Sequence, residues 1–102
     1  MFERHAGGER VILVALDFGT PDFLESVAEF RLLARGAGLD ILGEVQGKRS
    51  RPDAALFVGS GKADEIAALV AATEADVVIF NHELSPAQER NLERRLHCRV
   101  ID

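Results

Sequence analysis

The sequence has one cysteine, fewer basic than acidic residues, and no long hydrophobic run. Because Cys98 is alone, the chain forms no internal disulfide and no zinc site built from several cysteines, and a reducing compartment fits this usage. Twelve Lys and Arg against seventeen Asp and Glu give a formal charge of −5, which argues against RNA binding by an overall basic surface. No apolar run approaches the ~18 to 20 residues of a membrane-spanning helix. We expect a cytoplasmic protein without a membrane span, in which any contact with RNA must use a local patch.

What is present is typical of one small folded domain over residues 1–102, with 47% apolar and 28% charged residues. Short apolar runs predict strands covered on both faces, and apolar residues at helical spacing predict the helices. Strands are expected at 10–18, 39–48, 54–58, 76–80 and 99–102, and helices at 21–35, at 62–73 and from Ser85 to about Leu96. Ser85 and Gln88 match a capping box, which marks the start of the last helix. This alternation predicts an α/β fold, a small parallel-sheet (Rossmann-like) domain flanked by about three helices.

The segment 57–65 (FVGSGKADE) is similar to a phosphate-binding loop but lacks two of its parts. A nucleotide-triphosphate loop needs Gly five residues before Gly61 and Ser or Thr after Lys62, where this chain has Leu56 and Ala63. It is therefore not an NTPase site. Gly59, Ser60, Gly61 and Lys62 remain candidates for binding an anion or nucleotide, since they open a helix. The alternative is a turn that only needs glycines with positive φ.

Two groups of basic residues are candidates for contacts with RNA. Lys48, Arg49 and Arg51 form a basic loop, while Arg90 and Arg94 lie four residues apart on one side of the last helix. Either group could equally be a solvated surface, and Glu89 and Glu93 weaken the case for the helix.

Catalytic and metal sites have little support in the sequence. His82 beside Glu83 is a conceivable acid–base pair, but no serine or cysteine nucleophile has a visible base partner. No histidines or cysteines stand at the spacing of metal ligands. We predict no catalytic residue and no metal site in this chain.

The segments 57–62 (FVGSGK) and 78–93 (VIFNHELSPAQERNLE), together with 98–102 (CRVID), resemble the N-terminal domain of the HflX family of ribosome-associated GTPases. The resemblance implies a longer protein, in which a helical segment and a GTPase domain, absent here, follow this domain. GTP and magnesium are then expected in that GTPase domain, and no cofactor in this fragment. It also implies binding to rRNA of the large ribosomal subunit and splitting of stalled ribosomes under stress such as heat.

Two other roles stay open beside ribosome binding and regulation. The domain could be an accessory nucleotide- or phosphate-binding regulatory module, or a packing module that orients the absent helical and GTPase domains. The chain also ends directly after strand-like residues, from which we expect a longer protein divided at a domain boundary.

Overall fold

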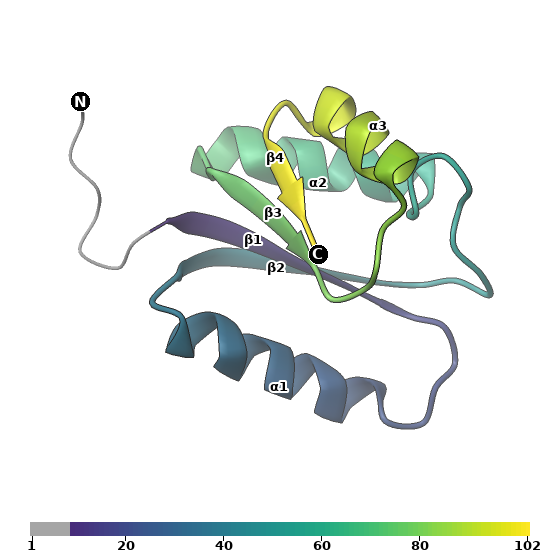
Figure 1. Ribbon diagram of the computed structural model, residues 1–102, viewed down its shortest axis with the longest axis horizontal. Coiled ribbons are helices and arrows are strands. Elements are labelled where there is room, and N and C mark those ends of the chain that lie inside the picture. The colour runs from purple at the N-terminus through teal and green to yellow at the C-terminus, as the bar shows by residue number, and fades with distance from the viewer. Residues whose placement is uncertain (1–8) are drawn as a thin grey trace.

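Within residues 9–102, which this computed structural model describes, four parallel strands form one sheet in the order β2-β1-β3-β4. The elements are β1 (Arg10–Asp17), α1 (Phe23–Gly36), β2 (Asp40–Lys48), α2 (Ser60–Thr73), β3 (Val77–Phe80), α3 (Pro86–Leu96) and β4 (Arg99–Ile101). Helix α1 lies on one face of the sheet, and α2 and α3 lie on the other (Figure 1). The predicted α/β fold with a parallel sheet and three helices is confirmed.

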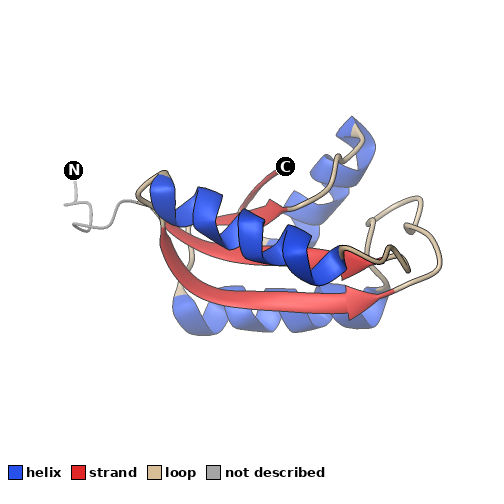
Figure 2. Ribbon diagram, turned by 90° about the horizontal axis from the view of Figure 1, so that it is seen from below, coloured by secondary structure: helices blue, strands red, loops and turns tan. Residues whose placement is uncertain are grey.

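The apolar run at the start of the chain is explained by the central position of β1. Residues Val11 to Leu16 are at most 2% exposed. Their side chains alternate between the two faces. Ile12 and Val14 join the core that includes Ile66 of α2 and Leu92 of α3, whereas Val11 and Leu13 join the smaller cluster that includes Ala34 of α1. Figure 2 shows α1 in front of the sheet, with the other two helices behind it. A strand covered on both faces has no polar face, which is why its sequence lacks alternation.

The strand predicted at 54–58 is wrong. Asp53 and Phe57 form an isolated antiparallel bridge. Between them, the amides of Ala55 and Leu56 donate to the Asp53 carboxylate at 2.9 and 2.8 Å. Both bonds lower the pKa of the Asp53 carboxyl, and the bond from the Leu56 amide has the largest effect. The side chain of Asp53 thus supplies a local partner for amides that would otherwise join a ladder, and the segment becomes a turn.

The capping box predicted at the start of α3 is confirmed. Ser85 Oγ accepts from the Gln88 amide at 3.1 Å, and Gln88 Oε1 accepts from the Ser85 amide at 2.9 Å. Gln88 Nε2 also donates to the Asp53 carbonyl at 2.9 Å, which ties the 53–57 turn to α3. No helix within residues 9–102 is long and apolar enough to cross a membrane.

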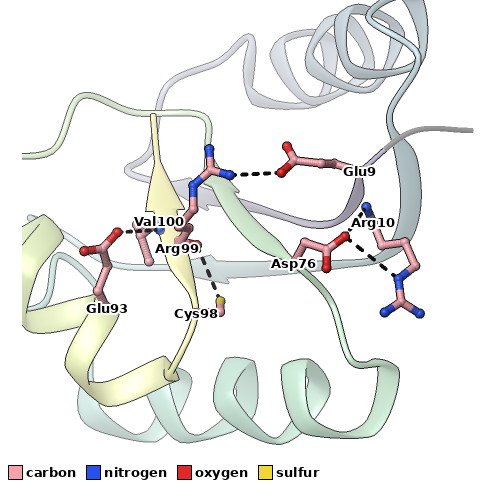
Figure 3. Close-up of polar contacts among 7 residues, drawn as sticks. All are labelled: Glu9, Arg10, Asp76, Glu93, Cys98, Arg99 and Val100. Atoms are coloured by element: carbon pink, nitrogen blue, oxygen red, sulfur yellow. Dashed lines mark hydrogen bonds and ion pairs between the residues drawn. The ribbon is translucent and has the colours of Figure 1, made fainter. Parts of the chain in front are cut away.

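Polar contacts hold the strands together at the end where β1 and β3 begin (Figure 3). The Arg10 amide donates to Asp76 Oδ2 at 3.0 Å, and Arg99 of β4 pairs with Glu9 at 2.9 Å. On the short strand β4, the Val100 amide donates to Glu93 Oε2 of α3 at 3.0 Å. The opposite end of the sheet, where the parallel strands finish, is where α/β domains ordinarily carry their functional sites.

Candidate functional site

A small basic cavity lies where β2 ends and α2 begins. Lys48 and Arg49 meet Gly59 and Lys62 around about 180 Å³, and Leu16, Gly47 and Val58 complete the lining. We call Lys48, Arg49, Gly59 and Lys62 the basic pocket. It combines part of the predicted anion site with part of the predicted basic loop, which are separate segments of the sequence.

Lys62 is held at the wall of the basic pocket by two acceptors. Its ammonium donates to the Gln46 carbonyl and to Glu65 Oε1, both at 3.0 Å. Its aliphatic stem lies against Gly47, where an added Cβ would stand 2.9 Å from Lys62 Cε. The Glu65 partner is itself exposed, so the ion pair is weak and the ammonium can exchange it for an anion.

The interpretation of the glycine turn as one that needs positive φ is wrong. Gly59 has φ −72° and ψ 163°, and helix α2 begins at Ser60, so that Gly61 lies inside the helix. Neither glycine has positive φ, whereas Phe57 does, at 68°. Gly59 instead permits a close approach, because a Cβ there would stand 2.7 Å from an Arg49 guanidinium nitrogen.

Helix α2 begins at the residue after Gly59, at the edge of the basic pocket. As the residue before the helix, Gly59 has no side chain that could cap the first amides. The exposed residues Ser60 and Gly61 form the first turn, whose amides and partial positive charge favour an anion. The basic pocket thus places cationic side chains beside a helix start, a combination that favours an anion such as phosphate.

The remaining basic candidates lie outside the basic pocket. Arg51 is exposed in the loop after β2, and its carbonyl accepts from Arg49 Nε at 3.0 Å. Arg90 and Arg94 are exposed on α3, and Arg94 lines a separate cavity with Arg95. Arg95 pairs with Asp64 of α2 at 2.7 Å, a tertiary contact that has no signal in the sequence. The structure thus separates the two predicted groups of basic residues.

An aromatic cluster packs around Phe57 in the loop between β2 and α2. Phe57 is 4% exposed, and its ring centroid lies 5.7 Å from that of Phe18, 6.0 Å from that of Phe80 and 5.1 Å from that of His82. The left-handed backbone of Phe57 turns this ring inward, a conformation that is rare for a bulky residue. This conformation has no signal in the sequence, because Phe in a short apolar segment is equally typical of a strand.

His82 belongs to this aromatic cluster. Its Nε2 accepts from the Leu16 amide at 2.9 Å, and burial lowers its pKa. The backbone thus engages Nε2, and the neighbouring Glu83 is exposed. In residues 9–102, no group of three or more His, Cys, Asp or Glu side chains could hold a metal ion.

Lowering the pH is expected to destabilise the protein through His82. In the unfolded chain His82 binds a proton near its ordinary pKa of 6.5, whereas the folded protein resists protonation because burial disfavours the charge. The stability that neutral His82 contributes is therefore present above pH 6.5 and lost as the pH falls towards the lowered folded pKa. Denaturant unfolding measured at about pH 7.5 and about pH 5 gives this difference.

His82→Gln is the matched control, because an amide oxygen can accept from Leu16 without titrating. Its free energy of unfolding should depend less on pH across that range than that of the unmodified protein. Equal pH dependence of the two proteins would show that His82 does not account for the loss.

The chain is similar to known proteins over most of its length. Residues 24–102 match the family described as GTP-binding GTPase N-terminal. The chain is 50% identical over 102 residues to GTPase HflX of Escherichia coli K12, covering the whole chain and 24% of that protein. It is 41% identical over 96 residues to GTPase HflX of Alkalihalophilus pseudofirmus, covering 92% of the chain and 23% of that protein. The chain thus spans about a quarter of the length of these curated relatives.

Solved structures share the fold at low sequence identity. A crystal structure of SsGBP in complex with GDP has a TM-score of 0.65 and 17% identity, covering 90% of this chain and 25% of that one. A variant of SsGBP has a TM-score of 0.66 and 19% identity, covering 91% of this chain and 28% of that one. At these identities the likeness supports the fold alone.

Proposed function

The chain belongs to the GTP-binding GTPase N-terminal family, the N-terminal domains of HflX GTPases, and from this premise we propose that it is the ribosome-binding and regulatory domain of a longer, cytoplasmic GTPase. In this proposal the full-length protein associates with the large ribosomal subunit and splits stalled ribosomes under stress. Residues 1–102 form the domain that contacts rRNA. The helical and GTPase domains, outside this sequence, are its partners within the same protein.

The basic pocket is the observation that carries the proposal. In a chain with a net charge of −5, Lys48, Arg49 and Lys62 converge beside the uncapped start of a helix. Arginine forks, lysine charges and helix-start amides are the groups that bind nucleic-acid phosphates. Arg51 extends the cationic surface along the same loop. A local cationic site on an acidic domain suits contact with a restricted segment of rRNA better than binding along an RNA surface.

GTP hydrolysis is assigned to the domain outside this sequence. The basic pocket has a lysine and helix-start amides but no Ser or Thr after Lys62 to hold magnesium, and Leu56 replaces the first glycine of a phosphate-binding loop. GTP and magnesium are therefore expected to bind in the GTPase domain, and this domain regulates that site from a distance.

The 102-residue protein is accordingly expected neither to hydrolyse GTP nor to bind it with measurable affinity. Titration of a fluorescent GTP analogue with magnesium, followed by a phosphate-release assay, tests both statements. Specific binding at micromolar concentration would contradict the proposed division of roles between the domains.

A second candidate function is an accessory phosphate or nucleotide site, and the enclosure of the basic pocket favours it. A site of about 180 Å³ has room for a phosphate group and offers donors from Lys62 and α2. This candidate predicts that phosphate or ATP raises the melting temperature of the unmodified protein, because a ligand bound only to the folded state stabilises it. Lys62→Ala should reduce that shift.

Glu65→Gln is the control for Lys62→Ala. It removes the partner charge at 3.0 Å and leaves the lysine in place. The shift caused by phosphate should therefore persist in Glu65→Gln if the site exists. Equal shifts in the unmodified protein and Lys62→Ala, or a shift in neither, would exclude the accessory site and leave the pocket to rRNA phosphates.

A further inference from the structure

The two outer strands of the sheet, β2 and β4, present backbone groups with which another strand could pair. Within residues 9–102, β2 pairs with β1 alone and β4 pairs with β3 alone. A free edge of this kind is a template for a strand of a second copy, and sheet proteins protect it with short edge strands, bulges or charged side chains. Strand β2 has nine residues and β4 has three, so β2 is the longer free edge.

The backbone of Gln46 faces the free edge of β2. Alternate residues of a strand direct their backbone amide and carbonyl to the same side. Directly after β2, the Arg49 amide donates to the Asp17 carbonyl of β1 at 3.0 Å, so that Gly47 and Val45 also face β1. Gln46 lies between these two residues and therefore directs its amide and carbonyl away from β1.

Lys62 of α2 occupies this free edge. Its ammonium donates to the Gln46 carbonyl at 3.0 Å, and its stem reaches the edge across Gly47. A strand added beside β2 would need the Gln46 carbonyl for an amide of its own and would have to displace Lys62. Because an ammonium carries three donors, an anion that replaces Glu65 in the basic pocket leaves the bond to Gln46 in place.

Glu93 of α3 occupies the free edge of β4 in the same way. The Val100 amide donates to Glu93 Oε2 at 3.0 Å (Figure 3). Since a side chain of α3 engages this amide, Val100 directs it away from β3, to the side where an added strand would bond. One edge thus has a cation on a strand carbonyl and the other a carboxylate on a strand amide, and burying either charge under a new strand is costly.

We propose that Lys62 and Glu93 close the two edges of the sheet against strand addition by a second copy of this domain. The start of β2 has a further obstacle, a register irregularity opposite Val11 and Ile12, so Lys62 protects the regular part of the strand at 43–48. Because the two edges differ, pairing of β2 with β4 of another copy would continue from copy to copy without closing. The inference does not depend on ribosome binding.

Sedimentation equilibrium of the 102-residue protein and its Lys62→Met variant tests the proposal at β2. Methionine keeps an unbranched side chain beside Gly47 but has no donor for the Gln46 carbonyl. The variant should self-associate about tenfold or more tightly, because a dimer through β2 no longer breaks one charged hydrogen bond in each copy. Lys48→Met is the matched control, since it makes the same change at an exposed side chain of β2 and leaves Lys62 bonded to Gln46.

Glu93→Met and Glu93→Gln form the corresponding pair at β4. Glutamine keeps an acceptor for the Val100 amide and should leave the protein monomeric, whereas methionine should promote association. Hydrogen exchange then identifies the surface that associates. The Gln46 amide should exchange more slowly in associated Lys62→Met than in the unmodified monomer, because an amide that faces solvent becomes paired.

The proposal is overturned if folded Lys62→Met and Glu93→Met remain as monomeric as the unmodified protein, with melting temperatures measured beside the sedimentation. Equal association of Lys48→Met and Lys62→Met would assign the effect to net charge and would also overturn it. Association of Lys62→Met that leaves the exchange of the Gln46 amide unchanged would place the contact on another face, with the same consequence. Should Lys62→Met fail to fold, the two Glu93 variants decide the question.

Discussion

Replacing Lys48, Arg49 and Arg51 with alanine in the full-length GTPase is expected to weaken its binding to large ribosomal subunits and to flatten the salt dependence of that binding. Each phosphate contact contributes roughly 0.9 to the slope of log affinity against log salt, because contact releases counterions. With three contacts, the unmodified protein should lose ~40-fold more affinity than the variant when salt rises from about 50 to about 200 mM. Binding measured by sedimentation across a salt series gives both slopes.

The matched control replaces Arg90 and Arg94 on α3 with alanine, which removes two exposed cationic side chains outside the basic pocket. This variant should keep the salt slope of the unmodified protein. Because Arg49 also bonds to the Arg51 carbonyl, the melting temperature of the triple variant is measured beside its affinity. An unchanged slope in the triple variant, or a reduced slope in the α3 variant, would move the RNA contact away from the basic pocket.

The largest effect on stability is expected from Phe57→Ala. Its ring fills the centre of the cluster formed with Phe18, Phe80 and His82, and the side chain is 4% exposed. Truncation of a buried Phe costs about 3–5 kcal/mol, since it removes contacts and leaves a cavity, and alanine keeps the cost of a left-handed backbone. The total free energy of unfolding of a small domain is about 5–15 kcal/mol, so Phe57→Ala should remove a large fraction of it. Urea unfolding measures it.

Leu24→Ala is the control for Phe57→Ala, because Leu24 is also a large apolar side chain but is 75% exposed. It should change the free energy of unfolding by no more than about 0.5 kcal/mol. A similarly small loss for Phe57→Ala would mean that the 53–57 turn is not anchored by its ring. The loop that carries Arg49 and Arg51 would then lack the support assigned to it.

The elements that the sequence predicted well are those specified by local rules. The apolar run of β1 and the capping box of Ser85 and Gln88 each depend on neighbouring residues, and both are found in the structure. The turn at 53–57 was mistaken for a strand because its apolar composition is the same in either state. What decides the outcome is one carboxylate, Asp53, whose bonds to two amides favour the turn.

The candidate site could be predicted only in parts. Lys48 and Arg49 were recognised as a basic loop, and Gly59 and Lys62 as a helix start, but their meeting in one pocket depends on where β2 and α2 are placed by the sheet. The role of Gly59 was likewise hidden, because close approach of the Arg49 side chain is a tertiary contact with no signature in the sequence. Strand order also required the structure.

Chemical footprinting of the 102-residue protein on large ribosomal subunits is the most direct test of the proposed function. The account predicts protection of a short stretch of rRNA by the unmodified protein, lost when Lys48, Arg49 and Arg51 are replaced with alanine and retained when Arg90 and Arg94 are replaced. Absence of any protection at concentrations where the full-length GTPase binds, or protection that the triple substitution leaves unchanged, would contradict it.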